Sequence, residues 1–127
     1  MIEGAVHGQS DAIVELAVLG PEGEKERLDF RIDAGFDGAL TLHSAVVAAL
    51  GLPQTGTKWV RLADGSTVLS DACDAHVEWD GALRRVGVQV ADIGALLGMA
   101  LLGGHRLRMD VVDGGVVRIS PLMTPEP

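Results

Sequence analysis

The residues best able to do chemistry lie in the segment from position 30 to 42, which reads FRIDAGFDGALTL. Asp33 ends an alternating run of apolar and polar residues, and two small residues, Ala34 and Gly35, follow it directly. Small residues let a second backbone approach a neighbouring side chain closely. Asp37 adds another carboxylate four residues later. A carboxylate that a second group can reach in this way is a candidate general acid or general base.

The same segment also fits a purely structural interpretation. Aspartate is common where a tight turn begins, because its side chain accepts hydrogen bonds from backbone N–H groups two residues on. Asp33 would then be held by its own backbone and would have no chemical role. Taken alone, the segment favours neither interpretation, so its neighbours along the chain must decide.

The cysteine and the histidines indicate no second reactive site. Cys73 is the only cysteine, so no disulfide can form within the chain, and we expect a small buried thiol. His76 is the nearest base, but three residues apart on a strand places two side chains on opposite faces. The histidines are widely spaced and form no metal-ligand pattern with Cys or Asp: His7, His43, His76 and His105. We therefore expect neither a metal nor a cofactor.

The composition limits both the fold and the partners. A chain of 127 residues favours one domain, and with aromatic residues at 3% the aliphatic side chains must fill the core. The net charge of -8 argues against nucleic acid and anionic membranes as partners, because phosphate binding needs clustered Lys and Arg. No apolar run reaches the roughly 18 residues that span a bilayer, and no signal-peptide pattern opens the sequence. A cytoplasmic location is the expectation.

Turn signals between apolar runs predict a β-rich domain. Asp-Gly pairs begin at positions 37, 64, 80 and 113, and this dipeptide suits tight hairpin turns because both residues tolerate positive φ. The patterns predict strands over residues 13–19, 28–33, 39–42, 58–63, 67–72, 76–79, 83–90, 107–112 and 116–119. Trp59 and Trp79 are expected in the core or on a sheet face.

Two short helical segments interrupt the predicted strands. Residues 44–50 are expected to form a helix that Ser44 caps and Gly51 ends. Residues 96–102 are wholly apolar and are expected to form a buried helical turn. A faint repeat is also present, because an apolar strand followed by a glycine-containing bend occurs at residues 30–38 and again at residues 88–98.

Three segments, in the right order, resemble the retropepsin-like aspartic proteases, in particular the small single-domain members of bacteria and archaea. Residues 30–42 are similar to the active-site loop, where an apolar strand leads into Asp-Thr-Gly or Asp-Ser-Gly. Residues 60–66, VRLADGS, resemble the flap hairpin that closes over substrate. Residues 96–102, LLGMALL, resemble the apolar-apolar-glycine loop and short helix behind the active site, and residues 107–110 resemble the terminal strand.

The resemblance implies a mainly β fold: a retropepsin-like, closed, β-barrel-like domain with one or two short helices and an active site on a twofold dimer axis. This domain takes in residues 1–120, and residues 121–127 are expected to form a loose C-terminal tail. The implied activity is that of an aspartic-type endopeptidase, a hydrolase that works as a homodimer. Each copy supplies Asp33, and the paired carboxylates activate a water, one as base and the other as acid.

The resemblance also assigns the other site residues and the partners. The residues expected to bind substrate come from the loop and the flap: Gly35, Asp37, Ala63, Asp64 and Gly65. The residues expected to complete the active-site loop are Ala34, Leu97 and Gly98. A turn-stabilising role for Asp37 and for Asp64 stays open. The expected partners are a second copy of the chain and a peptide or protein substrate.

The sequence departs from the family pattern at Ala34, where the family has threonine or serine. In the family that hydroxyl bonds across the dimer axis, and alanine cannot make this bond. A catalytically silent peptide-binding module of the same fold is therefore the alternative. Residues 32–36, IDAGF, also resemble a segment of the trimeric dUTPases, a minor alternative that lacks that family's phosphate-binding motifs.

Overall fold

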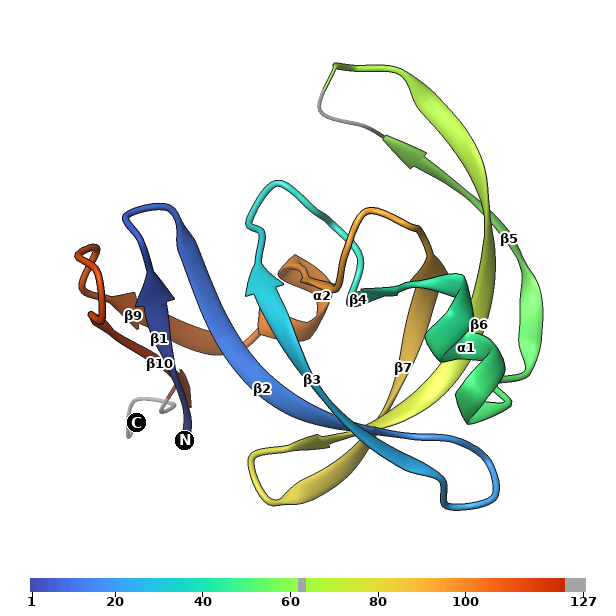
Figure 1. The fold of residues 1–127 in the computed structure, drawn as a ribbon, viewed down its shortest axis with the longest axis horizontal. Helices are drawn as coiled ribbons and strands as arrows, with labels where there is room; N and C mark the ends of the chain where they lie inside the picture. The colour runs from blue at the N-terminus through green and yellow to red at the C-terminus, as the bar shows by residue number, and fades with distance from the viewer. Residues whose placement is uncertain (62–63, 123–127) are drawn as a thin grey trace, which may run out of the picture.

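The computed structural model describes residues 1–61 and 64–122. Within these residues the chain is mainly β, with ten strands and two short helices (Figure 1). The strands are β1 (Ile2–His7), β2 (Asp11–Leu19), β3 (Lys25–Ile32), β4 (Leu40–Leu42), β5 (Gln54–Arg61), β6 (Thr67–Trp79), β7 (Ala82–Val90), β8 (Leu96–Leu97), β9 (His105–Met109) and β10 (Val116–Pro121). The helices are α1 (Ser44–Leu50) and α2 (Met99–Leu102).

The described strands form one sheet that closes on itself. Their order is β5-β6-β7-β4-β8-β3-β2-β1-β10-β9, with an additional pairing between β6 and β2. That pairing closes β2, β3, β8, β4, β7 and β6 into a barrel. In Figure 1 the β5–β6 hairpin rises from one side of the barrel, and β1, β9 and β10 lie together on the other side. The predicted mainly β, barrel-like fold is confirmed.

Large apolar side chains from all parts of the barrel fill its interior. Phe30, Leu40, Leu42, Val77 and Leu97 are each fully buried. Burying a side chain of this size stabilises a fold by roughly 1.5–3 kcal/mol. Four of these residues lie on β3, β4 and β8, the strands beside the acidic loop, so the packing that stabilises the barrel also fixes the frame of that loop.

The two bends of the faint repeat occupy matching places in the barrel. β3 leads into a bend at residues 33–39 and β4 follows, while β7 leads into a bend at residues 91–95 and β8 follows. β4 runs parallel to β7, and β8 runs parallel to β3, so the exit strand of each bend pairs with the entry strand of the other. β4 and β8 also pair with each other, at Leu40 and Leu97. This crossing brings residues 96–98 against the loop that carries Asp33.

The β6 strand corrects the predicted hairpins. We predicted separate strands at residues 67–72 and 76–79, but β6 is one continuous strand of 13 residues. Cys73 and Ala75 are buried and their backbone pairs with Val88 and Val86, so no break is needed. The β6–β7 turn has the predicted geometry, because φ is positive at both Asp80 and Gly81. The strand β1 was missed, since residues 2–7 do not alternate between apolar and polar types.

Helix α1 has the predicted bounds but not the predicted cap. Gly51 ends it in the left-handed conformation, with φ of 62°. The cap is His43, whose Nδ1 accepts a hydrogen bond from the Ala45 N–H at 3.0 Å, so the assignment of Ser44 was wrong. The Ser44 N–H instead donates to Asp92 Oδ1 at 2.9 Å. Asp92 comes from the bend at residues 91–95, a contact that a local capping rule cannot foresee.

The segment 96–102 and the C-terminal part also differ from the expectation. Residues 96–97 pair as strand β8, and only Met99–Leu102 is helical, because the backbone of β8 bonds to both neighbouring strands. At the other end, β10 continues through Pro121, and the Leu122 N–H donates to the Gly104 carbonyl at 3.0 Å. The remaining residues of the predicted tail, 123–127, lie outside the described residues.

The two tryptophans have different surroundings. Trp79 is buried, and its indole N–H donates to His105 Nε2 at 3.1 Å. The imidazole Nδ1 of His105 lies 2.9 Å from the Gly103 carbonyl, which makes Nδ1 the protonated nitrogen and leaves Nε2 as the acceptor. Trp59 lies on β5 and is 66% exposed, so it belongs to a sheet face and not to the core. No helix in the described part of the chain is long and apolar enough to cross a membrane.

Candidate active site

Asp33 lies directly after β3, where the chain leaves the barrel. Its backbone N–H donates to the Leu97 carbonyl at 2.9 Å, which fixes the residue against β8. The Gly35 N–H donates to Asp33 Oδ1 at 2.9 Å, and the Phe36 N–H donates to the Asp33 carbonyl at 3.1 Å. The loop is therefore a tight turn, as one interpretation of the sequence expected. The same turn holds Oδ1 in a fixed direction and leaves Oδ2 for another ligand, as the catalytic interpretation requires.

The loop rests on Gly98, at a distance that only glycine allows. The Gly98 N–H donates to the Ala39 carbonyl at 2.9 Å, and the Met99 N–H donates to the Phe36 carbonyl at 2.8 Å. A Cβ on Gly98 would lie 2.3 Å from the Gly38 carbonyl oxygen and 2.4 Å from Phe36 Cδ2. The predicted loop residues Leu97 and Gly98 are thus in direct contact with the Asp33 loop and support it.

Thr41 is a positioning residue that the sequence did not reveal. It lies on β4 and is 2% exposed. Its hydroxyl donates to the Gly94 carbonyl at 2.8 Å and accepts from the Leu96 N–H at 2.8 Å. One side chain therefore ties β4 to both the bend at residues 91–95 and the start of β8. Because β8 carries Leu97, this tie extends to the backbone that holds Asp33.

Replacing Thr41 with valine is expected to destabilise the protein by roughly 1–3 kcal/mol. Valine has the same branched shape but no hydroxyl, so the buried Leu96 N–H loses its partner, whereas Gly94 is exposed and its carbonyl can bind water. Thr41→Ser is the matched control, since it keeps the hydroxyl and loses only a methyl group. Chemical denaturation measures both. Equal stability of Thr41→Val and wild type would show that the hydroxyl does not hold this junction.

The tip of the β5–β6 hairpin is a tight turn built on Asp64. The Ser66 hydroxyl and N–H donate to Asp64 Oδ1 at 2.6 Å and 2.9 Å, and Gly65 has φ of 87°. The hydrogen bond from the Ser66 side chain, followed by that from its backbone, lowers the pKa of Asp64. Asp64 is therefore a turn-stabilising anion here, and Gly65 has the predicted positive φ. Ala63, also predicted to bind substrate, lies outside the described residues.

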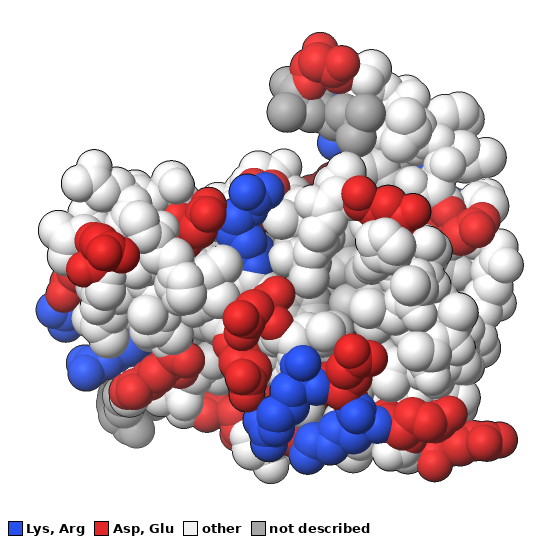
Figure 2. Space-filling model, viewed as in Figure 1, with Lys and Arg blue, Asp and Glu red and all other residues white. Residues whose placement is uncertain are grey.

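The β5–β6 hairpin projects from the barrel and carries exposed apolar side chains. Trp59 is paired across the strands with Leu69, and Val60 with Val68. Trp59, Leu69 and Val68 are 66%, 56% and 41% exposed. Figure 2 shows this hairpin overhanging a concave part of the surface, with acidic and basic side chains scattered over the same face. A projecting hairpin with apolar faces is suited to cover a bound chain.

A cavity of about 230 Å³ lies between the Asp33 loop and the base of this hairpin. It is lined by Asp37 and Gly38 from the loop, by Thr55 and Lys58 from β5, and by Gln89 from β7, among others. Asp37 is exposed at this cavity, in a place from which it can meet a ligand. The structure thus brings together one predicted binding residue and several residues that the sequence did not single out.

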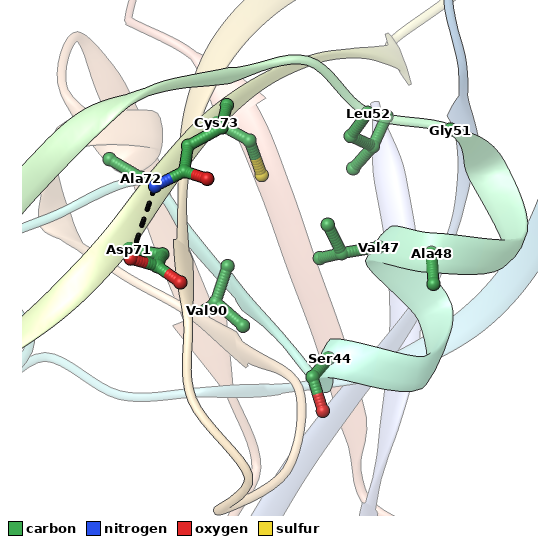
Figure 3. Close-up of a pocket in the computed structure, with 10 residues that line it drawn as sticks. Ser44, Val47, Ala48, Gly51, Leu52, Asp71, Ala72, Cys73 and Val90 are labelled. Carbon is green, nitrogen blue, oxygen red and sulfur yellow. Dashed lines mark hydrogen bonds between the residues drawn. The ribbon is translucent and has the colours of Figure 1, made fainter.

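A separate cavity of about 260 Å³ lies between α1 and β6 (Figure 3). Val47, Leu52, Cys73 and Val90 form its apolar part. Cys73 is buried, as predicted, while His76 is exposed on the opposite face of β6. Burial, and to a lesser extent the nearby Asp74 and Asp71 charges, raise the pKa of the Cys73 thiol, which keeps it protonated and unreactive. None of the predicted site residues that the structure describes lines this cavity.

Ala34 is exposed at the turn beside Asp33, where a neighbouring molecule could reach it. Within residues 1–61 and 64–122, no group of three or more His, Cys, Asp or Glu side chains is arranged to hold a metal ion.

No protein-family model and no curated protein matches the sequence. Among solved structures, the chain is similar to the crystal structure of a retropepsin-like aspartic protease from Rickettsia conorii. The match covers 94% of this chain and 90% of that chain, with a TM-score of 0.60 and 16% sequence identity. At this identity the likeness shows the fold, which is retropepsin-like as predicted.

Proposed function

We propose that the chain is an aspartic endopeptidase that acts as a homodimer, with the two Asp33 carboxylates activating a water for peptide hydrolysis. The observation that carries the proposal is the Asp33 loop in a retropepsin-like fold. Its carboxylate has one oxygen held by the Gly35 N–H at 2.9 Å and a backbone fixed to Leu97. One carboxylate takes the proton of the water, and the other, protonated, polarises the scissile carbonyl. Two carboxylates close enough to hold the same water share one proton, because their like charges oppose the ionisation of both.

A dimer is proposed because of the carboxylates that a single chain can supply. The bend at residues 91–95, which matches the Asp33 bend in the barrel, also contains an aspartate, Asp92. The Ser44 N–H donates to Asp92 Oδ1 at 2.9 Å and the Ser44 hydroxyl to Oδ2 at 3.3 Å. These contacts, with a smaller effect of His43, lower the pKa of Asp92. They hold the Asp92 side chain at the start of α1. The second catalytic carboxylate is therefore assigned to Asp33 of another copy, across a twofold axis.

The exposed Ala34 favours one second candidate, a peptide-binding module without catalysis. Alanine offers no hydroxyl to the partner loop, so the dyad of the proposed dimer is less firmly braced than in the family. The cavity beside Asp37 and the apolar hairpin do not depend on that hydroxyl. Both candidates therefore predict a dimer that binds peptides, and hydrolysis alone separates them.

Sedimentation across a concentration range, paired with a peptide-hydrolysis assay, tests the proposal. We expect a reversible dimer whose population and hydrolytic activity rise together with protein concentration. A strict monomer at high micromolar concentration contradicts the proposal, since half a dyad cannot perform the reaction. A dimer that binds peptides without cleaving them supports the binding module. Including dUTP among the substrates covers the dUTPase alternative.

A further inference from the structure

Gln89 is a buried amide whose oxygen has no hydrogen-bond partner. It lies near the end of β7 between Val88 and Val90 and is 5% exposed. Its backbone is paired with Ala72 of β6 on one side and Thr41 of β4 on the other. No group in the described part of the chain donates a hydrogen bond to its Oε1. Buried polar groups in folded proteins are nearly always bonded, so this oxygen calls for an explanation.

The cavity beside Asp37 is where a ligand can meet the Gln89 amide. Gln89 lines this cavity together with Asp37, Gly38 and Lys58. A Cβ on Gly38 would lie 3.2 Å from Gln89 Nε2, and it would also clash with Phe36, so glycine at this position leaves the amide its room. At about 230 Å³ the cavity is large enough to receive one amino-acid side chain.

The charges around the cavity leave a mixed polar lining. Asp74 also lines it, but the Arg85 Nε donates to Asp74 Oδ2 at 3.0 Å, so this carboxylate is already paired. Asp37 and Lys58 are both exposed, and they bring one hydrogen-bond acceptor and one donor of opposite charge to the same opening. A ligand group that enters here meets a carboxylate, an ammonium and a buried amide.

We propose that this cavity is a specificity subsite for a carboxamide side chain, glutamine or asparagine, in the peptide substrate, and that Gln89 recognises it. The proposal rests on the proposed function, since it names the substrate class of the same site. As placed, Nε2 is the amide atom beside Gly38 at the cavity, and it donates to the ligand oxygen together with Lys58; with the Gln89 amide turned, Oε1 takes its place and accepts from the ligand NH₂. Because a carboxamide both donates and accepts, the pairing holds whichever way the Gln89 amide is turned.

Other side chains fit this lining less well. A carboxylate could pair with Lys58, but it has no hydrogen to give to Gln89 Oε1 and would face Asp37. A lysine or arginine side chain could pair with Asp37 and donate to the Gln89 amide oxygen, but it would face Lys58 and offers no acceptor to Lys58 or to the Gln89 NH₂. An apolar side chain would leave the Gln89 amide unpaired in a site now closed to water, and sites built to bond a polar group reject analogues that lack it.

Two measurements test the proposal. A degenerate peptide library, with cleavage sites located by mass spectrometry, should show enrichment of glutamine or asparagine at one position near the scissile bond. Matched peptides with glutamine, glutamate or methionine at that position are then bound to the Asp33→Asn protein, which does not consume them. We expect the glutamine peptide to bind about tenfold or more tightly, as one buried hydrogen-bonded pair allows.

The variant Gln89→Met, which has nearly the same size but no amide, should reduce this preference to about twofold or less. Gln9→Met is the control, because Gln9 is exposed in the turn between β1 and β2 and should change nothing. Cleavage or binding without preference for a carboxamide, or a preference unchanged in Gln89→Met, overturns the inference and leaves the proposed function standing. Absence of any peptide binding or cleavage overturns both.

Discussion

Replacing Asp33 with asparagine is expected to lower peptide hydrolysis by at least about 10³-fold while the protein stays folded and dimeric. General acid–base catalysis typically contributes 10²–10⁴-fold, and a carboxamide at this position can neither take the proton of the water nor share a proton with its twin. The fold should persist because asparagine keeps an Oδ1 acceptor for the Gly35 N–H, the bond that shapes this turn. Initial rates on a cleaved peptide measure the loss, and the thermal midpoint reports the fold.

Asp29→Asn is the matched control for this experiment. Asp29 lies on β3, the strand that leads to Asp33, four residues before it, and its side chain is exposed on the outer face of β3. The substitution removes the same charge four residues earlier in the chain, so the activity of this variant should equal that of wild type. Hydrolysis that survives Asp33→Asn would show that another residue performs the reaction and would remove the dyad from the proposed function.

Local sequence patterns were enough to predict the parts of the site that chain neighbours build. The turn after Asp33 depends on the N–H of a residue two positions on, and the hairpin tip depends on Asp64, Gly65 and Ser66, which are adjacent. For the same reason helix α1 was predicted with its observed bounds. In the two turns and at the Gly51 end of α1 the physical cause lies within a few residues, and a turn or C-cap rule expresses that cause directly, whereas the N-cap was assigned to the wrong residue.

The parts that could not be predicted depend on contacts between distant segments. Thr41 bonds to residues 53 and 55 positions away along the chain. The role proposed for Gln89 depends on β7 passing beside the Asp37 loop, and Asp92 bonds to Ser44 only because the bend at residues 91–95 meets the start of α1. A threonine or glutamine in a strand carries no sign of such a partner in the sequence. The faint repeat was the one local signal of this crossing, and it became interpretable only with the strand pairings known.

Replacing Gly98 with alanine is expected to destabilise the protein by about 3 kcal/mol, since overpacking a well-filled site typically costs 1–3 kcal/mol and more where backbone must move. The backbone of Gly98 has φ of -112°, which any residue adopts, so the cost comes from space alone. The added Cβ would lie 2.3 Å from the Gly38 carbonyl oxygen and 2.7 Å from that of Phe36. Both are backbone atoms of the loop that Asp33 begins, and neither can swing aside as a flexible side chain would.

Gly103→Ala is the matched control, five residues further on, at the other end of α2. There φ is -52° and the nearest atom to an added Cβ is the Ala100 carbonyl oxygen at 3.7 Å, an ordinary contact. This variant should be neutral or slightly stabilising, because alanine restricts the unfolded chain. Thermal unfolding at one protein concentration should therefore show a midpoint roughly 10 °C lower for Gly98→Ala and unchanged for Gly103→Ala. Equal midpoints would mean that residues 96–98 do not press against the Asp33 loop.

A folded Gly98→Ala protein should also lose hydrolysis out of proportion to its stability, because the loop that it displaces is the one that aims the Asp33 carboxylate.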